Sequence, residues 1–229
     1  MSSESRKPMG LKKNYGSIPH LPGSRVGPAE HTINDGQARM VLEGSKEKGD
    51  VVWCQEKLDG SNVGVYRINN EIIPITRAGY VADTSPYEMH HRFYEWALNS
   101  RERFLAVLEE GERLCGEWLY QPHGTLYNLP HEPFVAFDVM KGNARLPYLE
   151  FFRRTSYSFV TPCTISGPIS IEDAKNSFGV CGRHGAVDPI EGFVWRLERK
   201  REVAFLCKYV HHWKEDGKYL RNKWPREDE

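Results

Sequence analysis

The sequence predicts an α+β fold of twisted, mainly antiparallel sheets with flanking helices. Short β-prone runs are joined by tight turns, as at the Asn69-Asn70 step between residues 62–68 and 72–76. Helical patterns fall between such runs at uneven intervals, without the regular alternation of strand and helix that a parallel sheet requires. With 229 residues, of which 39% are hydrophobic, the chain can bury one sizeable core. We therefore expect a single folded domain.

The remaining elements follow from hydrophobic spacing and turn residues. A capping box with proline at the first helical position, Ser85-Pro86-Tyr87-Glu88, predicts a helical region that ends at Gly111. A shorter helix is expected over residues 171–178. Further strands are expected at 51–55, 114–120, 134–139, 193–197 and 203–209. Residues 1–30 are rich in Ser, Gly, Pro and Lys, which indicates a flexible basic arm before a folded domain at 31–229.

Composition excludes several classes of protein. No run of about 18 apolar residues exists, so a membrane role is unsupported. The first ten residues lack the apolar stretch of a secretory signal, and the five cysteines include no Cys-x-x-Cys pair. These features favour buried free thiols in a reducing compartment, the cytoplasm or the nucleus. Cys181 and His184 could form half of a metal site, but no second pair with suitable spacing accompanies them.

Affinity for nucleic acid has to come from local patches, because 31 basic residues balance 31 acidic ones. Residues 1–26 hold five Lys or Arg and one Glu, and residues 208–226 hold six Lys or Arg with two acids. The second stretch also contains Trp213, Tyr219 and Trp224, which could stack on bases or pack on the core. Its candidate RNA contacts are Lys214, Lys218 and Arg221. The alternative is a solvated basic helix held by its aromatic residues.

One segment carries the signature of a nucleophile. Lys57-Leu58-Asp59-Gly60 is a weak signal alone, since these residues are common in turns. Five further segments follow in a fixed order and stand at predicted strands or their ends. They are Arg77, Cys115-Gly116-Glu117-Trp118, residues 134–139, Glu191-Gly192-Phe193-Val194-Trp195-Arg196 and Phe205-Leu206-Cys207-Lys208. In this order they resemble the motifs of the covalent nucleotidyltransferases, the superfamily of ATP-dependent DNA ligases, RNA ligases and mRNA capping enzymes.

Two features narrow the resemblance to the family 2-like RNA ligases. Asn62 stands where DNA ligases and capping enzymes usually have Arg. Only 21 residues follow Lys208, too few for the oligonucleotide-binding (OB-fold) domain of those enzymes. The resemblance implies an adenylyltransferase domain with the ligase catalytic core fold, acting on RNA with 5′-phosphate and 3′-OH ends. A partner protein could replace the missing C-terminal domain.

The resemblance also implies the roles of individual residues. Lys57 would take AMP from ATP as a lysyl-AMP intermediate, and Lys208 would contact the α-phosphate. Glu191 would bind Mg²⁺ or Mn²⁺, both of which prefer oxygen ligands. Residues expected to bind ATP are Glu56 through its backbone, Asn62, Arg77, Glu117 and Phe137. Phe137 would stack on adenine, although a core aromatic is the alternative interpretation of that position.

The chemistry requires Lys57 to be neutral. An unperturbed lysine has a pKa of about 10.4 and is protonated at pH 7. Positive charge from Arg77, Lys208 and a divalent cation, together with partial desolvation, would favour the neutral amine. The same cations would stabilise charge on the transferred phosphoryl group.

One departure affects the expected activity. Where the last motif usually has two lysines flanking one residue, this chain has Leu206 and Lys208. One step of ligation would then be slow or rely on another base, such as Arg199 or Lys200. Two alternatives to a sealing ligase follow: a non-catalytic module that binds nucleotide or RNA ends, and an adenylyltransferase that does not seal. GTP in place of ATP would identify a capping-type enzyme.

Overall fold

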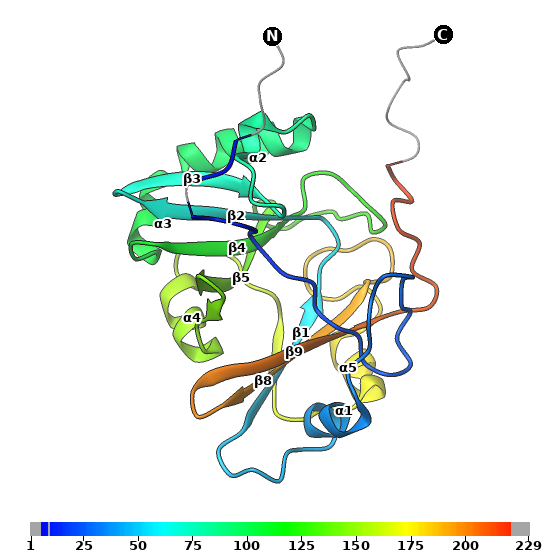
Figure 1. The fold of residues 1–229 in the computed structure, drawn as a ribbon. Helices are drawn as coiled ribbons and strands as arrows, with labels where there is room; N and C mark the ends of the chain where they lie inside the picture. Colours follow the sequence, from blue (N-terminus) through cyan, green and yellow to red (C-terminus); the bar gives the residue numbers. More distant parts are fainter. Residues whose placement is uncertain (1–5, 9, 221–229) are drawn as a thin grey trace. The chain divides into compact units, whose positions relative to one another are not determined.

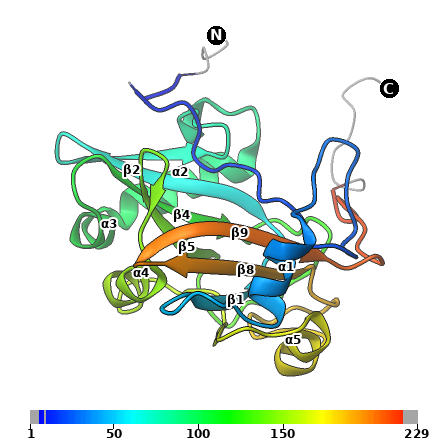
Figure 2. The same cartoon turned by 60° about the horizontal axis from the view of Figure 1, so that its bottom comes forward.

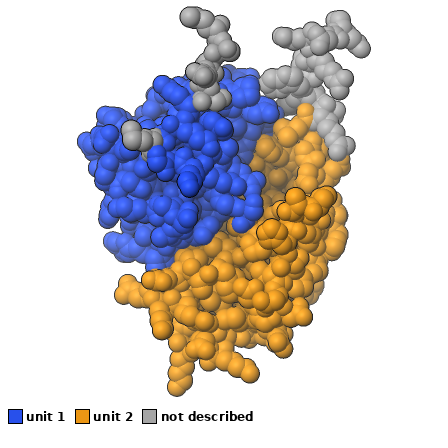
Figure 3. Space-filling view, viewed as in Figure 1, with its two compact units in different colours: residues 1–17, 61–121, 132–161 blue, residues 18–60, 122–131, 162–229 orange. Residues whose placement is uncertain are grey.

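The structure is a computed structural model that describes residues 6–8 and 10–220, and its elements are labelled in Figure 1. It divides into two compact units, which Figure 3 colours separately. Unit 1 comprises residues 1–17, 61–121 and 132–161, and unit 2 comprises residues 18–60, 122–131 and 162–229. Each unit is therefore assembled from three separated segments of the chain.

Unit 2 is built on a four-stranded antiparallel sheet. Its strand order is β7 (Thr164–Ser166), β1 (Val51–Lys57), β8 (Gly192–Arg199) and β9 (Glu202–Val210). Phe193, Trp195 and Leu197 alternate along β8 and so share one face of the sheet. They form one buried core with residues of α1 (Asp35–Leu42) and α5 (Ile171–Phe178). The two helices are visible beside this sheet in Figure 2.

Unit 1 is built on a five-stranded antiparallel sheet. Its strand order is β3 (Glu71–Thr76), β2 (Ser61–Ile68), β4 (Glu112–Trp118), β5 (Phe134–Lys141) and β6 (Ala144–Arg145). The helices of this unit are η1 (Ala82–Thr84), α2 (Glu88–Asn99), α3 (Arg101–Val107) and α4 (Tyr148–Thr155). Aromatic rings join α2 and α3 to β5: the ring of Phe134 lies 5.2 Å from that of Trp96 and 5.9 Å from that of Phe104.

The predicted α+β class with antiparallel sheets is confirmed, as are the seven expected strands and the helix at 171–178. At the β2–β3 turn, Asn69 and Asn70 have φ of 53° and 60°. Asn tolerates this left-handed region, and the pair forms the kind of two-residue turn that matches the twist of a hairpin. Residues 58–60, which follow Lys57, connect β1 to β2 without pairing them, because β1 belongs to the sheet of unit 2 and β2 to that of unit 1.

The expected helical region over 85–111 differs from the structure. It forms two helices that meet at Ser100, and the first begins only at Glu88. The capping box is absent, because Ser85 Oγ instead accepts from the Tyr87 amide and lies 2.6 Å from His90 Nδ1. Helices α1 and α4, with only eight residues each, were not predicted.

The N-terminal segment corrects the expectation of a flexible arm at residues 1–30. Asn14 and Tyr15 are buried in unit 1, and His20 and Leu21 are buried in unit 2. Their amides and carbonyls bond to neighbouring segments, as in the bond from the Asn14 amide to the Arg77 carbonyl. Isolated buried side chains in a stretch without periodicity leave no pattern to detect, which explains the error.

The part of the chain that the structure describes contains no helix long and apolar enough to cross a bilayer. Residues 211–220 form turns, so the alternative of a basic helix does not hold for them.

Candidate functional site

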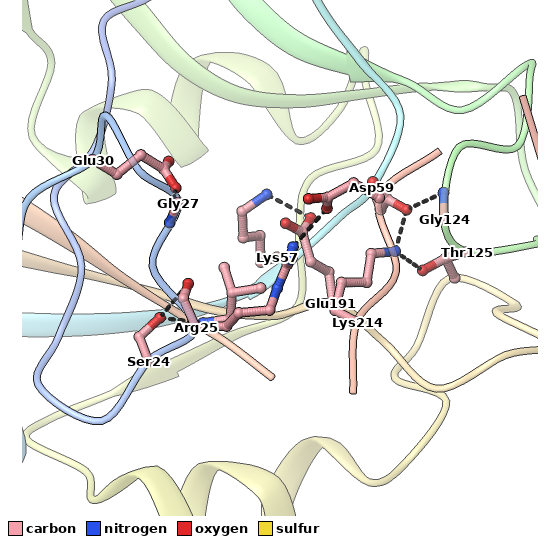
Figure 4. Close-up of polar contacts among 12 residues, drawn as sticks. Ser24, Arg25, Gly27, Glu30, Lys57, Asp59, Gly124, Thr125, Glu191 and Lys214 are labelled. Atoms are coloured by element: carbon pink, nitrogen blue, oxygen red, sulfur yellow. Dashed lines mark hydrogen bonds and ion pairs between the residues drawn. The ribbon is translucent and has the colours of Figure 1, made fainter. Parts of the chain in front are cut away.

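Lys57 lies at the end of β1, where its side chain meets Glu191. The distance from Lys57 Nζ to Glu191 Oε2 is 2.6 Å, and the two side chains are 22% and 11% exposed. Figure 4 shows the pair among the polar residues of unit 2. Burial raises the pKa of Glu191, and the charge of Lys57 opposes that rise. The carboxylate orients the amine and favours its protonated form, so Lys57 has to lose a proton before it can attack an electrophile.

Strand pairing explains why these two residues meet. β1 and β8 run antiparallel with Lys57 opposite Gly192, so Glu191 falls directly beside the lysine. Gly192 is required here, since a Cβ at this position would lie 1.9 Å from the Tyr209 carbonyl oxygen on β9. Gly192 thus allows β8 to approach β9 closely, and Glu191 beside it faces Lys57 at the end of β1.

A second lysine holds the loop that follows Lys57. Lys214 Nζ donates to the Asp59 carboxylate and, over 2.7 Å, to Thr125 Oγ1. The Gly124 amide also donates to Asp59 Oδ2 over 2.7 Å (Figure 4). The Lys214 side chain is only 1% exposed. This buried network fixes the Asp59 end of the Lys57–Gly60 segment.

Lys208 is held by a carboxylate from the N-terminal segment. Its Nζ lies 2.5 Å from Glu30 Oε1, and Glu30 also accepts from the Gly27 amide and lies 3.0 Å from His20 Nε2. Burial disfavours ionisation of Glu30, but the bonds from Lys208 and Gly27 and the charges of Lys208 and His20 outweigh it and lower its pKa to about 2. The Glu30 carboxylate is therefore ionised and forms an ion pair with the Lys208 amine.

Glu56 points away from Lys57 into a buried position beside residues 182–183. Its Oε2 accepts from the Arg183 amide over 2.9 Å, and Gly182 lies so close that a Cβ would be 2.1 Å from Oε1. Burial raises the pKa of Glu56 to about 7. The backbone amide of Glu56 bonds to the Cys163 carbonyl, which leaves the predicted purine contact of this backbone as a proposal.

Unit 1 brings three predicted site residues to one end of its sheet. Asn62 lies opposite Glu117 on the neighbouring strand, and Arg77 directly follows the last β2–β3 pair, Val63 and Thr76. Asn14 links two of them: its amide bonds to the Arg77 carbonyl, and its side chain donates to Asn62 Oδ1 over 3.2 Å. Asn62, Arg77 and Glu117 thus lie at the same end of the unit 1 sheet.

Phe137 stands at an irregularity in β5, where the register with β4 shifts between Cys115 and Gly116. Its ring lies 5.1 Å from that of Tyr15 in an edge-to-face arrangement, and the side chain is half-buried. Tyr15 in turn donates to the buried carboxylate of Asp138 over 2.8 Å. A ring that is braced on one side and partly open is consistent with stacking, and it is not the fully buried core aromatic of the alternative interpretation.

The predicted RNA contacts have different surroundings. Lys214 is buried against Asp59, so its amine is engaged within the protein. Lys218 is 43% exposed and lies 3.0 Å from Asp188, which also accepts from the Tyr219 hydroxyl over 2.6 Å. Arg221 lies outside the described residues. Lys218 therefore remains open to an RNA phosphate in this structure, and Lys214 does not.

The proposed substitutes for the lysine missing at Leu206 lie in the wrong place. Arg199 and Lys200 stand at the far end of the β8–β9 hairpin from Gly192. β8 has eight residues, so Arg199 lies about 23 Å from Gly192 along the strand. Arg199 also pairs with Asp50 at 2.7 Å. Neither residue can serve a phosphate held at Lys57.

The donor set is compatible with a divalent cation that also binds substrate. No three His, Cys, Asp or Glu side chains gather as a metal site within residues 6–8 and 10–220. Magnesium, however, is often held by one or two carboxylates with substrate phosphates and water. Glu191, buried beside a cationic amine, meets that requirement. His184 is not a ligand with Cys181, since its ring nitrogens meet His131 and the Cys163 amide.

Two antiparallel sheets with flanking helices match the fold expected of a ligase catalytic core. The family model for RNA ligase matches residues 50–210, more than half of the chain. The chain therefore belongs to the RNA ligase family.

Solved structures show the same fold. An archaeal ATP-dependent RNA ligase matches with a TM-score of 0.50 and 20% identity, over 86% of this chain and 48% of that one. A variant of a Naegleria gruberi RNA ligase without ligand matches with a TM-score of 0.53 and 15% identity, over 87% of this chain and 57% of that one. Another variant of a Naegleria gruberi RNA ligase, with AMP and Mn, matches with a TM-score of 0.51 and 14% identity, over 89% and 61%. The chain thus spans about half the length of these proteins. A search among curated protein sequences finds no match.

Sequence reasoning missed several residues of the site in unit 2, among them His20, Glu30 and the pairing of Lys214 with Asp59. The first two fall within the expected arm, where nothing in the spacing indicates a contact with β9.

Proposed function

We propose that this chain is the catalytic core of an ATP-dependent RNA ligase that works through a lysyl-AMP intermediate at Lys57. The observation that carries this proposal is the Lys57–Glu191 pair at 2.6 Å, placed by strand pairing at the end of β1. Both residues stand within the region that the RNA ligase family model covers.

In the first step, Lys57 Nζ attacks the α-phosphorus of ATP. A P–N bond forms, the bond from the α-phosphorus to the bridging oxygen breaks, and pyrophosphate leaves. The nitrogen has to shed its protons, and the partial exposure of Lys57 leaves it a path to solvent. Glu191 holds the amine at the strand end, so the nucleophile is oriented before ATP arrives.

Glu191 would hold Mg²⁺ or Mn²⁺ together with phosphate oxygens. Such a cation would neutralise charge on the phosphates and favour the neutral form of the amine. Lys208 would contact the α-phosphate after exchanging Glu30 for it.

The residues of unit 1 would serve the nucleotide in the roles that the motifs imply. Phe137, braced by Tyr15, would stack on adenine, and Glu117 would accept from the ribose. Arg77 and Asn62 would contact phosphates of ATP or RNA. The backbone of Glu56 would read the purine edge.

In the later steps AMP passes to the 5′-phosphate of an RNA, and a 3′-hydroxyl then displaces AMP to seal the strand. An adenylyltransferase that does not seal is the second candidate. It is favoured by Leu206, which is 7% exposed and buried in β9 where a cation is expected. An apolar side chain at this position cannot bind a phosphate.

Incubation with α-labelled ATP tests the proposal. We expect the wild-type protein to become labelled with Mg²⁺ or Mn²⁺ and the Lys57→Ala variant to remain unlabelled. Absence of label on the wild-type protein with both cations contradicts the proposal and leaves a non-catalytic binding module. Labelling by GTP in place of ATP identifies a capping-type enzyme.

A chase with 5′-phosphorylated RNA and DNA then separates the two candidates. Transfer of the label to RNA followed by joined product indicates a ligase. Transfer without joining indicates an adenylyltransferase. Equal transfer to DNA contradicts the assignment of RNA as acceptor.

A further inference from the structure

The absence of a lysine at position 206 leaves the α-phosphate region one cation short, and the structure offers a replacement in the N-terminal segment. Arg199, the first proposed substitute, lies about 23 Å from Gly192 along β8. The replacement has to come from a segment that reaches the other end of β9, where Lys208 stands.

Residues 19–25 lie alongside that end of β9. The Lys208 amide donates to the Pro19 carbonyl, and the Leu21 amide donates to the Lys208 carbonyl over 2.8 Å. Farther along, the Arg25 amide donates to the Val210 carbonyl over 3.0 Å. Since Val210 lies opposite Gly192, Arg25 is positioned one strand away from Glu191.

The side chain of Arg25 extends from this segment toward the Lys57–Glu191 pair (Figure 4). Its guanidinium lies within electrostatic range of Glu191 and Glu30, and its Nη2 is 2.7 Å from Asp216 Oδ1. Its Nε is buried and has no hydrogen-bond partner among the residues that the structure describes. The guanidinium thus retains an unused donor within electrostatic range of Glu191, the partner of Lys57.

The bond to Asp216 is one that a phosphate can displace. Asp216 is 73% exposed and Arg25 is 34% exposed, and an ion pair of this kind contributes little to stability because water solvates both charges. A phosphate offers several acceptor oxygens to the planar guanidinium, which binds it through two parallel hydrogen bonds.

We propose that Arg25 is a catalytic residue that binds a phosphate of ATP beside Lys208 and takes the place of the lysine that Leu206 replaces. This inference rests on the proposed function. It adds a residue outside the recognised motifs, from a segment that lies ahead of the nucleophile in the sequence.

The test compares the rate of adduct formation at ATP concentrations below saturation. We expect Arg25→Ala to label about 100-fold more slowly than wild type, since it removes one donor to the developing charge. Arg25→Lys is expected to retain part of the rate. Arg199→Ala serves as the matched control, because Arg199 also pairs with an acid but stands at the far end of the hairpin. It is expected to label at the wild-type rate.

A second variant tests the replacement directly. Leu206→Lys restores the missing cation. The double variant Arg25→Ala with Leu206→Lys is therefore expected to form the adduct at least about tenfold faster than Arg25→Ala alone. Thermal unfolding of each variant checks that it folds. A wild-type rate in Arg25→Ala, an equal loss in Arg199→Ala, or no recovery in a folded Leu206→Lys double variant overturns the proposal.

Calorimetric titration with ATP separates this inference from the proposed function. If the wild-type protein forms no adduct, the proposed function fails, and the affinity for ATP still tests Arg25. About tenfold weaker binding by Arg25→Ala than by wild type supports the role in phosphate binding. Equal affinity overturns it.

Discussion

Two lysines of unit 2 pair with carboxylates close together in the molecule, yet their surroundings differ. Lys214 is 1% exposed and has two side-chain acceptors, Asp59 and Thr125. Lys57 is 22% exposed and meets Glu191 at a strand end. A buried and fully bonded amine is costly to separate from its partner, whereas a half-buried one can exchange its partner for a substrate. Burial, more than charge, distinguishes Lys214 from Lys57, the proposed nucleophile.

The largest effect is expected from substitution of Lys57, the lysine proposed to form the AMP adduct. Lys57→Met is expected to reduce the adduct by more than about 1,000-fold, because no other amine occupies its place. Label remaining on Lys57→Met protein, located on a peptide that contains Lys214, would reverse the assignment. The measurement is mass spectrometry of the peptides after incubation with ATP.

Substitution of Lys214 is expected to affect mainly the stability of the fold. Lys214→Met leaves Asp59 with an unbalanced charge and is expected to lower the free energy of unfolding by about 3 kcal/mol. Urea unfolding followed by tryptophan fluorescence measures the change. Adding Asp59→Asn removes the unbalanced charge and is expected to restore part of the loss. An unchanged midpoint in Lys214→Met would show that the pair is not structural.

The next prediction concerns Glu191, the ion-pair partner of Lys57. Glu191→Gln preserves the shape of the side chain but removes its charge, so adduct formation is expected to fall about 100-fold while the unfolding midpoint stays near that of wild type. Lys175→Gln, on the exposed surface of α5, is a control for removing a charge. A rate of adduct formation equal to wild type at saturating Mg²⁺ would exclude Glu191 from the reaction.

In unit 1, Phe137→Ala is expected to raise the KM for ATP about tenfold with a smaller change in kcat, since a stacking contact is worth about 1 kcal/mol beyond its buried area. The readout is the dependence of labelling rate on ATP concentration. Phe152→Ala, an exposed aromatic of α4, is a matched control. An unchanged KM for ATP in Phe137→Ala would show that the ring does not stack on adenine.

The smallest effect is expected at a third pair, Asp50 and Arg199. The hydrogen bond from Arg199 holds the pKa of Asp50 at about 2, below its unfolded value of about 3.9. The pair therefore stabilises the fold above about pH 4, and its contribution is lost as the pH falls through about 2. Asp50→Asn is expected to cost no more than about 1 kcal/mol at pH 7 and less at pH 3, by urea unfolding. An equal cost at both values would show that the charge contributes nothing.

Much of the fold was predictable because strands and turns are encoded locally. The Asn69-Asn70 turn and the alternation along β8 each follow from a few adjacent residues. The pairing of β1 with β8, the separation of β1 and β2 into two sheets, and the break at Ser100 depend on distant packing that spacing does not reveal.

The candidate site divides in the same way. Lys57, Glu191 and Lys208 could be named because they stand in ordered motifs. Glu30 could not, since only its ion pair with Lys208 brings it to β9, and Arg25 could not, since only the bonds between residues 19–25 and β9 place it near Glu191. Lys214 was noticed for its charge alone, and burial gave it a different partner from the RNA that was expected.

The pairing of β1 with β8 also bears on how the chain is made. Lys57 and Glu191 are separated by 134 residues in sequence, so the strand that ends in the nucleophile leaves the ribosome on the order of ten seconds before its main partner. During that interval the apolar β1 has at most the three-residue β7 beside it. An unpaired apolar strand invites association with other chains. The edge of β1 therefore stays open to such association until β8 has been made and pairs with it.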